Sequence, residues 1–358
     1  MRSAQSATNY GKPTTIIDGG WDGVVSCPRT GGICDPETGF GDDAFMLTNH
    51  LSNPTPGVVL RNLEIRDFES SQLGTVGGYA NTNWLMENLY VHDNIHGVRI
   101  GESSRLSWSL ISDNYWFGVT ANSTRDGIME DSELRNNHRN EDWGHTTWGA
   151  SATKFVKTTN FIIRRNYSHH NLGPGLWSDI DNDGTLFEGN LVEDNLRSGI
   201  QHEVSYSATI RNNTVRRNGG AANIYISNSA GTSDQPIRVY GNIVEDHPQW
   251  EIMIYDNGTR WDNGSRSPRP DHISIYDNTL KHSNTRGRVA GVYGDNGGPD
   301  LTKNFKWWGN DYTVNGALVD KPFEWGDSDQ DWVGWNALAD STSHLHDNTP
   351  GASFTSTP

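Results

Sequence analysis

The chain has 358 residues, of which 39 are Gly and 33% are hydrophobic, and its formal net charge is -16 at pH 7. A composition so rich in Gly, Asn and Asp is too turn-rich for a helical fold and favours a turn-dense β architecture. The negative charge and the scattered Lys and Arg argue against a nucleic-acid partner, because phosphates require clustered cations.

Residues 1–60 are expected to form an incomplete first coil and a loop closed by a disulfide. Cys27 and Cys34 end the short loop CPRTGGIC, which is rich in Gly and Pro, so their sulfurs can meet easily. Two reduced thiols are the alternative. The N-terminus has no charged-then-apolar signal pattern, and no apolar run approaches the roughly 20 residues that span a bilayer, so no membrane partner is expected.

Residues 61–315 repeat one short phrase, in which an Asn or small polar residue is followed by an apolar pair and, five residues after the first, by a second Asn or Asp. Successive phrases start about 21 to 36 residues apart, which is the length of one β-helix coil with variable loops. The first and second members are Asn62 and Asp67, Asn88 and Asp93, Ser109 and Asn114, Ser132 and Asn137, Asn166 and Asn171, Asn190 and Asn195, Asn213 and Asn218, Asn242 and His247, Asn278 and Ser283, and Asn310 and Asn315.

Each phrase predicts a short strand that ends at a sharp turn, where Asn tolerates left-handed dihedrals, and stacked coils place these Asn in ladders. A propeller blade is longer, and an antiparallel sandwich shows hairpin pairs rather than one phrase per coil. The pattern therefore predicts an all-β, parallel β-helix of about ten coils. Residues 316–358 lack the phrase and are expected to cap the open end, so that residues 1–358 form a single domain.

A second strand follows each turn and alternates with period two. The alternation predicts that Leu176, Ser178 and Ile180 point into one coil and that Ile200, His202 and Val204 point into the next. It turns Trp177, Asp179 and Asp181 outward, with Gln201, Glu203 and Ser205 beside them. His202 is then interpreted as a core histidine.

The chain has 14 Trp and 12 Tyr, more than so polar a core needs, and aromatic faces are common platforms for sugar rings. We therefore expect a polysaccharide partner. A monomer is expected, because the sequence shows no extra regions of the kind that intertwine in trimers. A glycan partner together with the disulfide indicates a secreted protein.

Three carboxylates are expected on one flank. Neighbouring parallel strands lie about 4.8 Å apart, so Asp179 should sit beside Glu203, with Asp181 two residues along on the same face. Such a cluster can hold a hard cation or supply an acid and a base for glycoside hydrolysis, and a solvated charged face is the alternative.

Further candidate residues surround these acids. Lys154, on the strand of the preceding coil, is a candidate base if it faces them. Trp177 and Gln201 are candidate glycan contacts beside the acids. His170 in a turn is a candidate to line the same cleft, with an ordinary surface turn as the alternative. Trp148 in the long insertion 140–148 is a candidate cleft wall.

The coil phrases, with GPGLWSDIDNDGTLFEGNLVEDN and GIQHEVSYSATIRNNTVRRN, resemble the pectate-lyase-like superfamily of right-handed parallel β-helix proteins. The resemblance covers nearly the whole chain and implies a carbohydrate-active protein. It implies that Asp179, Asp181 and Glu203 hold Ca2+ and that Lys154 acts as the base, as in the calcium-dependent lyases. The residue sets of polygalacturonases and alginate epimerases are not found, which disfavours those two activities.

Three functions follow from these features. The first is a lyase, in which a bound cation neutralises a uronate carboxylate and Lys154 removes the adjacent proton before β-elimination. The second is a hydrolase that uses Asp179 and Glu203, or Asp181, as acid and base. The third is a β-helix that binds a glycan without turnover.

Overall fold

The computed structural model describes residues 15–18, 55–68, 76–77, 81–139, 151–258, 261–262, 265–266, 268–295, 298–318, 320–326, 328–338 and 353–357. The chain divides into two compact units, residues 1–173 and 174–358. The organisation as one domain over residues 1–358 stays a prediction. Cys27 and Cys34 lie outside the described residues, so their disulfide also stays a prediction.

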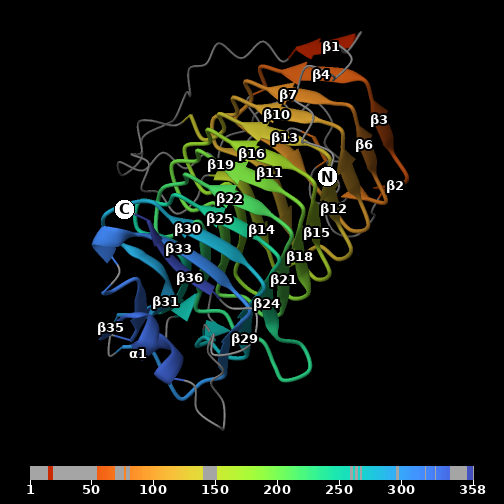
Figure 1. Ribbon diagram of the computed structural model, residues 1–358. Helices are drawn as coiled ribbons and strands as arrows, with labels where there is room; N and C mark the ends of the chain where they lie inside the picture. Colours follow the sequence, from red (N-terminus) through yellow and green to blue (C-terminus); the bar gives the residue numbers. More distant parts are fainter. Residues whose placement is uncertain are drawn as a thin grey trace, which may run out of the picture. The chain divides into compact units, whose positions relative to one another are not determined.

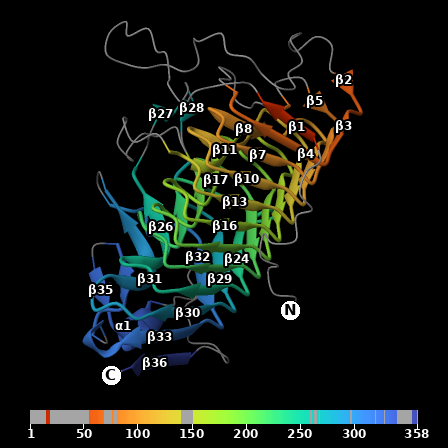
Figure 2. The same ribbon diagram turned by 90° about the horizontal axis from the view of Figure 1, so that it is seen from above.

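Each unit is a stack of coils in which every coil contributes strands to three parallel sheets (Figures 1 and 2). In the first unit, sheet 1 contains β1 (Thr15–Asp18), β4 (Leu63–Arg66), β7 (Tyr90–His92), β10 (Leu110–Ser112), β13 (Glu133–Arg135) and β16 (Tyr167–His169). Sheet 2 contains β8 (His96–Arg99), β11 (Phe117–Asn122) and β14 (Ser151–Val156). Sheet 3 contains β3 (Val59–Arg61), β6 (Leu85–Glu87), β9 (Arg105–Ser107), β12 (Ile128–Glu130) and β15 (Ile162–Arg164), and β2 (Thr55–Pro56) pairs with β5 (Asn81–Thr82).

The second unit repeats the arrangement. Sheet 1 contains β19 (Leu191–Glu193), β22 (Thr214–Arg216), β25 (Ile243–Glu245), β30 (Thr279–His282), β33 (Asp311–Asn315) and β36 (Ser353–Thr357). Sheet 2 contains β17 (Leu176–Asp179), β20 (Ile200–Glu203), β23 (Ile224–Ser227), β26 (Trp250–Asp256), β31 (Arg288–Gly294), β34 (Phe323–Trp325) and the antiparallel β35 (Ser328–Gln330). Sheet 3 contains β18 (Thr185–Glu188), β21 (Ala208–Arg211), β24 (Ile237–Tyr240), β29 (Ile273–Tyr276) and β32 (Phe305–Trp308), and β27 (Trp261–Asp262) with β28 (Ser265–Arg266) forms a hairpin.

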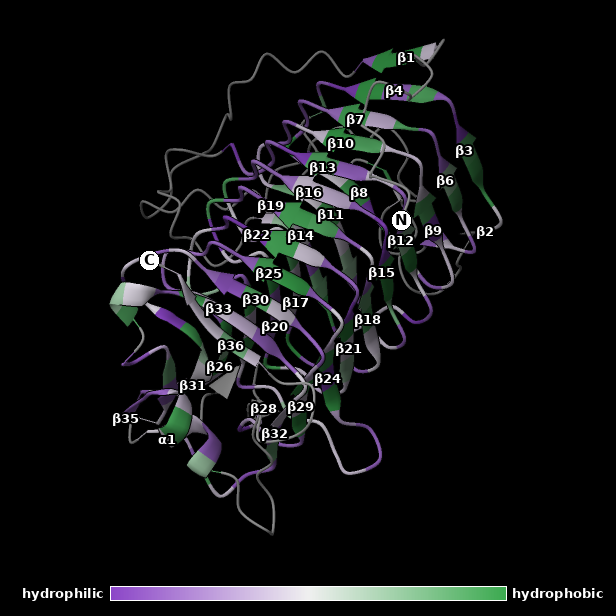
Figure 3. Cartoon of the chain, in the orientation of Figure 1, coloured by the Kyte–Doolittle hydropathy of each residue, from purple (hydrophilic) through white to green (hydrophobic). Residues whose placement is uncertain are grey.

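Identical registers on successive coils build the core. On sheet 2 of the second unit, Leu176, Ile200, Ile224 and Ile252 are register partners and are fully buried. Burying such side chains relative to solvent stabilises the fold by about 1.5 to 3 kcal/mol each. Strands accordingly carry hydrophobic residues, and many of the turns between them are hydrophilic (Figure 3). The sequence prediction of a parallel β-helix is confirmed.

Ladders of buried Asn and Ser line the turns, as the sequence predicts. In the second unit, Asn190, Asn213, Asn242, Asn278 and Asn310 are linked by side-chain amides that donate to the next Asn at 2.9 to 3.0 Å. In the first unit, Asn94, Asn114, Asn137 and Asn171 form a comparable ladder.

The turn geometry corrects one detail of the prediction. The left-handed residue is the one before each ladder Asn, such as Arg165 with φ 55° and Asp277 with φ 52°. The chain bends at this preceding residue. The side chain of the ladder residue then points inward, where it forms hydrogen bonds with backbone groups that water does not reach. In the first two coils the predicted members Asn62, Asp67, Asn88 and Asp93 are themselves left-handed, with φ 57°, 59°, 53° and 52°, so the ladder position in the second coil is Asn94 rather than Asp93.

The described part of residues 316–358 holds a 3-10 turn, η4 (Gly316–Leu318), and one short helix, α1 (Trp332–Ala337). Asp331 accepts a hydrogen bond from the backbone N–H of Gly334 and so caps α1. The buried Trp335 of α1 packs on Trp307 and Phe323, with ring centroids 5.2 and 4.7 Å apart. No helix in the described ranges is long and apolar enough to cross a bilayer.

Candidate functional site

Asp179 and Glu203 form a carboxylate pair on the second unit's sheet 2. They are register partners on β17 and β20, as the sequence predicts, and are only 4% and 3% exposed. Neighbouring parallel strands are about 4.8 Å apart, so the backbones of the two residues are separated by roughly that distance. Two carboxylates on adjacent strands can act at one bond, as an acid and a nucleophile or as an acid and a base.

Gln201 orients one member of this pair. Its side-chain amide donates to Oε2 of Glu203 at 2.7 Å, and the two residues lie two positions apart on the outer face of β20. The hydrogen bond limits the rotamers available to the carboxylate, which favours a fixed orientation.

Asp181 does not lie where the alternation predicted. Strand β17 ends at Asp179, and both Ile180 and Asp181 adopt left-handed dihedrals, with φ 61° and 57°. The chain therefore turns before Asp181, and the two-residue strand step does not apply. Among the residues that the structure describes, no group of three or more His, Cys, Asp or Glu side chains is arranged to hold a metal ion.

Trp177 lies in register with Gln201 and Tyr225 and is only 3% exposed, as buried as Asp179 and Glu203 on the same two strands. Its role as a glycan contact stays a prediction. Ser205, which the alternation predicted on the outer face, instead belongs to a buried turn ladder with Asn182.

His202 is a core histidine, as the sequence predicts. Its Nε2 donates to the carbonyl oxygen of Tyr206 at 2.8 Å, so its Nδ1 accepts from the hydroxyl of Ser178 at 2.7 Å. Burial lowers the pKa of His202 from 6.5 to about 4, which keeps the ring neutral.

Neutral His202 makes the fold acid-sensitive. The unfolded chain binds a proton at this position below pH 6.5, whereas the folded chain does not until about pH 4. Stability contributed by the neutral ring should therefore be lost as pH falls through that window, by up to about 1.4 kcal/mol per pH unit. The variant His202→Gln keeps a donor for Tyr206, and its unfolding free energy, measured by denaturant titration, should depend less on pH between 6.5 and 4. An unchanged slope would contradict the assignment.

Lys154 belongs to the first unit. It lies on β14 in register with Thr120, while its neighbours Thr153 and Phe155 are fully buried, so Lys154 is on the outer face of that strand and half-buried. Its role as a base opposite Asp179 and Glu203 stays a prediction.

His170 lies at a turn of the first unit, directly after β16 of sheet 1, whereas Lys154 lies on sheet 2. It has φ 53° and an exposed side chain whose Nδ1 lies 2.7 Å from Nδ1 of His169. This is the bend residue before the ladder residue Asn171, so the ordinary turn interpretation accounts for it. Trp148 lies outside the described residues.

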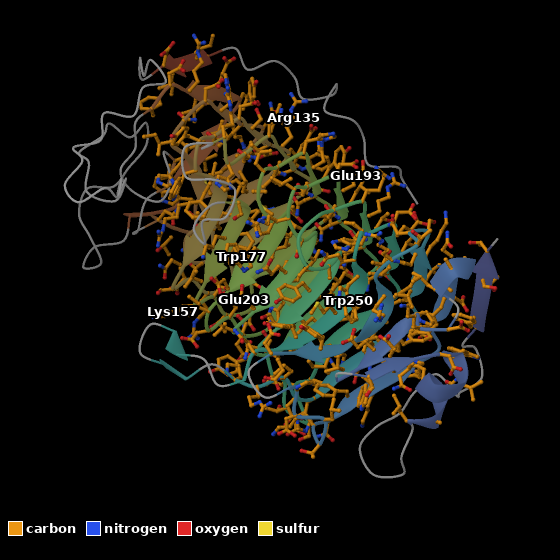
Figure 4. All side chains as sticks on the ribbon, turned by 90° about the vertical axis from the view of Figure 1, so that its left-hand side faces the viewer. Arg135, Lys157, Trp177, Glu193, Glu203 and Trp250 are labelled. Atoms are coloured by element: carbon orange, nitrogen blue, oxygen red, sulfur yellow. The ribbon has the colours of Figure 1, made fainter. Side chains whose placement is uncertain are left out.

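The sequence interpretation missed an aromatic group that continues the row of the carboxylate pair. Register partners after Glu203 are Ser227, Tyr255 and Tyr293. The alternation in Ile252–Met–Ile–Tyr255 predicts that Tyr255 points outward. Its register with Glu203 could not be predicted, because long loops separate these coils in the sequence. Figure 4 looks onto the side that carries Trp177, Glu203 and Trp250.

The comparisons with known proteins agree on the fold. Residues 74–304 match the model of the right-handed β-helix region. No curated protein matches the sequence.

Solved structures resemble the chain at low identity. A mutant of the periplasmic alginate epimerase AlgG has 12% identity and a TM-score of 0.54, and the match covers 84% of this chain and 69% of that one. The A-module of mannuronan C-5 epimerase AlgE4 from Azotobacter vinelandii has 12% identity and a TM-score of 0.50, over 85% and 74% of the two chains. A tailspike protein mutant of E. coli bacteriophage HK620 has 11% identity and a TM-score of 0.51, over 84% and 55%. At such identities the likeness shows the fold alone.

Proposed function

The chain belongs to the right-handed β-helix family, and from this premise we propose that it is a carbohydrate-active enzyme that hydrolyses a glycosidic bond at Asp179 and Glu203. The observation that carries the proposal is the register pairing of these two buried carboxylates on adjacent strands. Retaining glycosidases hold their two carboxyl groups roughly 5 to 5.5 Å apart, and side chains on neighbouring strands, whose backbones are about 4.8 Å apart, can supply such a close pair.

In this proposal Glu203 is the nucleophile that attacks the anomeric carbon. The hydrogen bond from Gln201 to its Oε2 supports that role, because it holds the carboxyl group in one orientation. Asp179 then protonates the glycosidic oxygen of the leaving sugar. After the leaving group departs, the Asp179 carboxylate takes a proton from water, whose oxygen displaces Glu203 and releases the sugar.

A lyase is the second candidate, because Lys154 lies on the outer face of β14. Elimination requires Lys154 to reach the C–H beside a uronate carboxylate, whose charge must be neutralised for the proton to leave. Ca2+ held by Asp179, Asp181 and Glu203 stays a proposal, and the turn at Asp181 weighs against it. A secreted, monomeric protein is part of both proposals.

The deciding experiment incubates the full chain with neutral and acidic polysaccharides, each with Ca2+ or with a chelator. For the hydrolase, new reducing ends should appear in both conditions without the ultraviolet absorbance of an unsaturated uronate. Absorbance that chelator abolishes would overturn the hydrolase in favour of the lyase, and silence in both assays would favour a binding protein.

The variant Asp181→Asn separates the two candidates again. For the hydrolase, kcat/KM should stay within about twofold of the unmodified chain, because Asp181 lies on a turn beyond the strand. A loss of an order of magnitude or more would instead support a metal site that includes Asp181.

A further inference from the structure

Three tyrosines lie on the outer face of β23, β26 and β31, beyond the carboxylate pair. Tyr225 and Tyr255 have ring centroids 5.9 Å apart and tilted by 40°, and Tyr255 and Tyr293 have centroids 6.0 Å apart and tilted by 24°. Trp250 adjoins Tyr293 at 6.4 Å. All four side chains are half-buried.

The spacing of these rings differs from that of the aromatic stack on sheet 3 of the same unit. Tyr240, Tyr276 and Trp308 have centroids 4.8 and 4.3 Å apart and planes within 8°, so each ring covers the face of its neighbour. The Tyr225, Tyr255 and Tyr293 rings are farther apart and more tilted than those of sheet 3. Half-buried aromatic rings of this kind are suited to contact the apolar C–H face of a sugar.

Asp295 sets the hydrogen-bonding character of this group. The hydroxyl of Tyr255 donates to Oδ2 of Asp295 at 2.6 Å, and the hydroxyl of Tyr293 donates to Oδ1 at 3.1 Å. Both phenol protons are used, so the two oxygens and the exposed carboxylate offer acceptor positions to a ligand. A ligand that fits must donate hydrogen bonds, as sugar hydroxyls do, and a uronate carboxylate at this point would meet another anion.

Two arginines that the structure describes near this face are held by acids. The Nε of Arg269 donates to Oδ1 and Oδ2 of the buried Asp256 at 3.2 and 3.0 Å, and its Nη2 donates to Oδ2 at 2.6 Å. Arg288 contacts Glu324 at 3.6 Å and also pairs with Asp329. The exposed acid Asp295 therefore sets the charge beside the tyrosines, which disfavours a polyanionic ligand there.

We infer that Tyr255, Tyr293 and Asp295 form a subsite for an uncharged sugar ring, so that the substrate is a neutral polysaccharide and not a uronate polymer. The inference rests on the proposed function, which sets the cleaved bond at Asp179 and Glu203. From Glu203 to Tyr255 the register advances by two strands, roughly 10 Å at about 4.8 Å per strand. The subsite binds sugars remote from the cleaved bond.

The test measures binding, not cleavage, in the full chain carrying Asp179→Asn, by affinity gel electrophoresis and calorimetry. The probes are soluble xyloglucan, mixed-linkage β-glucan, galactomannan and dextran as neutral polymers, and polygalacturonate and alginate as acidic ones. At least one neutral polymer should bind more tightly than both acidic ones. Adding Tyr293→Ala should weaken that binding at least tenfold, equivalent to about 1.4 kcal/mol.

Two further variants keep the test decisive. Tyr293→Phe keeps the ring and removes the hydroxyl, so it should bind between the parent and Tyr293→Ala, even if the alanine variant unfolds. Tyr276→Phe, in the tight stack of sheet 3, should bind like the parent.

Tighter binding of an acidic polymer, no binding of any neutral polymer, or binding indifferent to Tyr293 would each overturn the inference. If binding depends on Tyr293 and the chain without substitutions cleaves nothing, the hydrolase fails and the subsite stands. If a neutral polymer is cleaved but its binding is indifferent to Tyr293, the hydrolase stands and the subsite fails.

Discussion

Replacing Asp179 by Asn should lower kcat on the cleaved polysaccharide by about 10²- to 10⁴-fold, the range that general acid–base catalysis contributes, and replacing the nucleophile Glu203 by Gln should lower it at least as much. Each substitution preserves the shape of the side chain on β17 or β20 and removes only its acid–base or nucleophilic chemistry. Reducing-end kinetics on the purified variants measures the loss. The two losses should not add in the double variant, because the carboxylates act on one bond.

Glu245→Gln is the matched control. It removes a carboxylate from β25, on sheet 1 of the same unit, and should leave kcat unchanged. The spacing of the pair also predicts that the first product keeps its anomeric configuration, which NMR of the fresh product detects. Loss of activity in the control as large as in Asp179→Asn, or inversion of configuration, would contradict the assignment of the pair.

Replacing Glu251 by Ala should destabilise the second unit by about 3 to 5 kcal/mol, because it breaks a buried ion pair. Glu251 is fully buried and accepts from Nδ1 of His282 at 2.8 Å and from the side chain of Asn223 at 2.6 Å. Its other contact is the backbone N–H of His247 at 2.9 Å. Without the carboxylate these donors are left unsatisfied inside the coil, and chemical denaturation should show the loss.

Two comparisons sharpen that experiment. Glu251→Gln retains an acceptor oxygen, so it should cost less than Glu251→Ala. Asp234→Asn changes an exposed turn residue and should stay within about 0.5 kcal/mol. A cost below about 1 kcal/mol for Glu251→Ala would show that the network is not a stabilising element.

Burial also governs how this network titrates. Burial raises the pKa of Glu251 above 4.5. Burial lowers the pKa of His282, but the hydrogen bond and charge of Glu251 outweigh that effect, so the pKa of His282 is raised above 6.5. The stabilisation from protonated His282 is therefore complete below pH 6.5 and is lost as pH rises through its folded-state pKa.

The parallel β-helix could be predicted from the repeat alone, because every coil repeats the same constraints. A bend and a ladder residue close each strand, and an alternating strand follows, so local spacing predicts which residues stack. The same logic placed Asp179 beside Glu203 and His202 in the core, since each pair of coils is in simple register there.

The end of that alternation and the burial of each side chain could be seen only in the folded structure. Two left-handed residues remove Asp181 from the strand, and Trp177 is buried although it occupies an outward position. Tyr255 and Tyr293 lie in register with Glu203, but long connections separate their strands in the sequence. The length of a connection does not predict the register of the strands that it joins, so this alignment could not be predicted. Local patterns therefore predict the coils. Which side chains are exposed on the outer face depends on contacts between residues far apart in the chain.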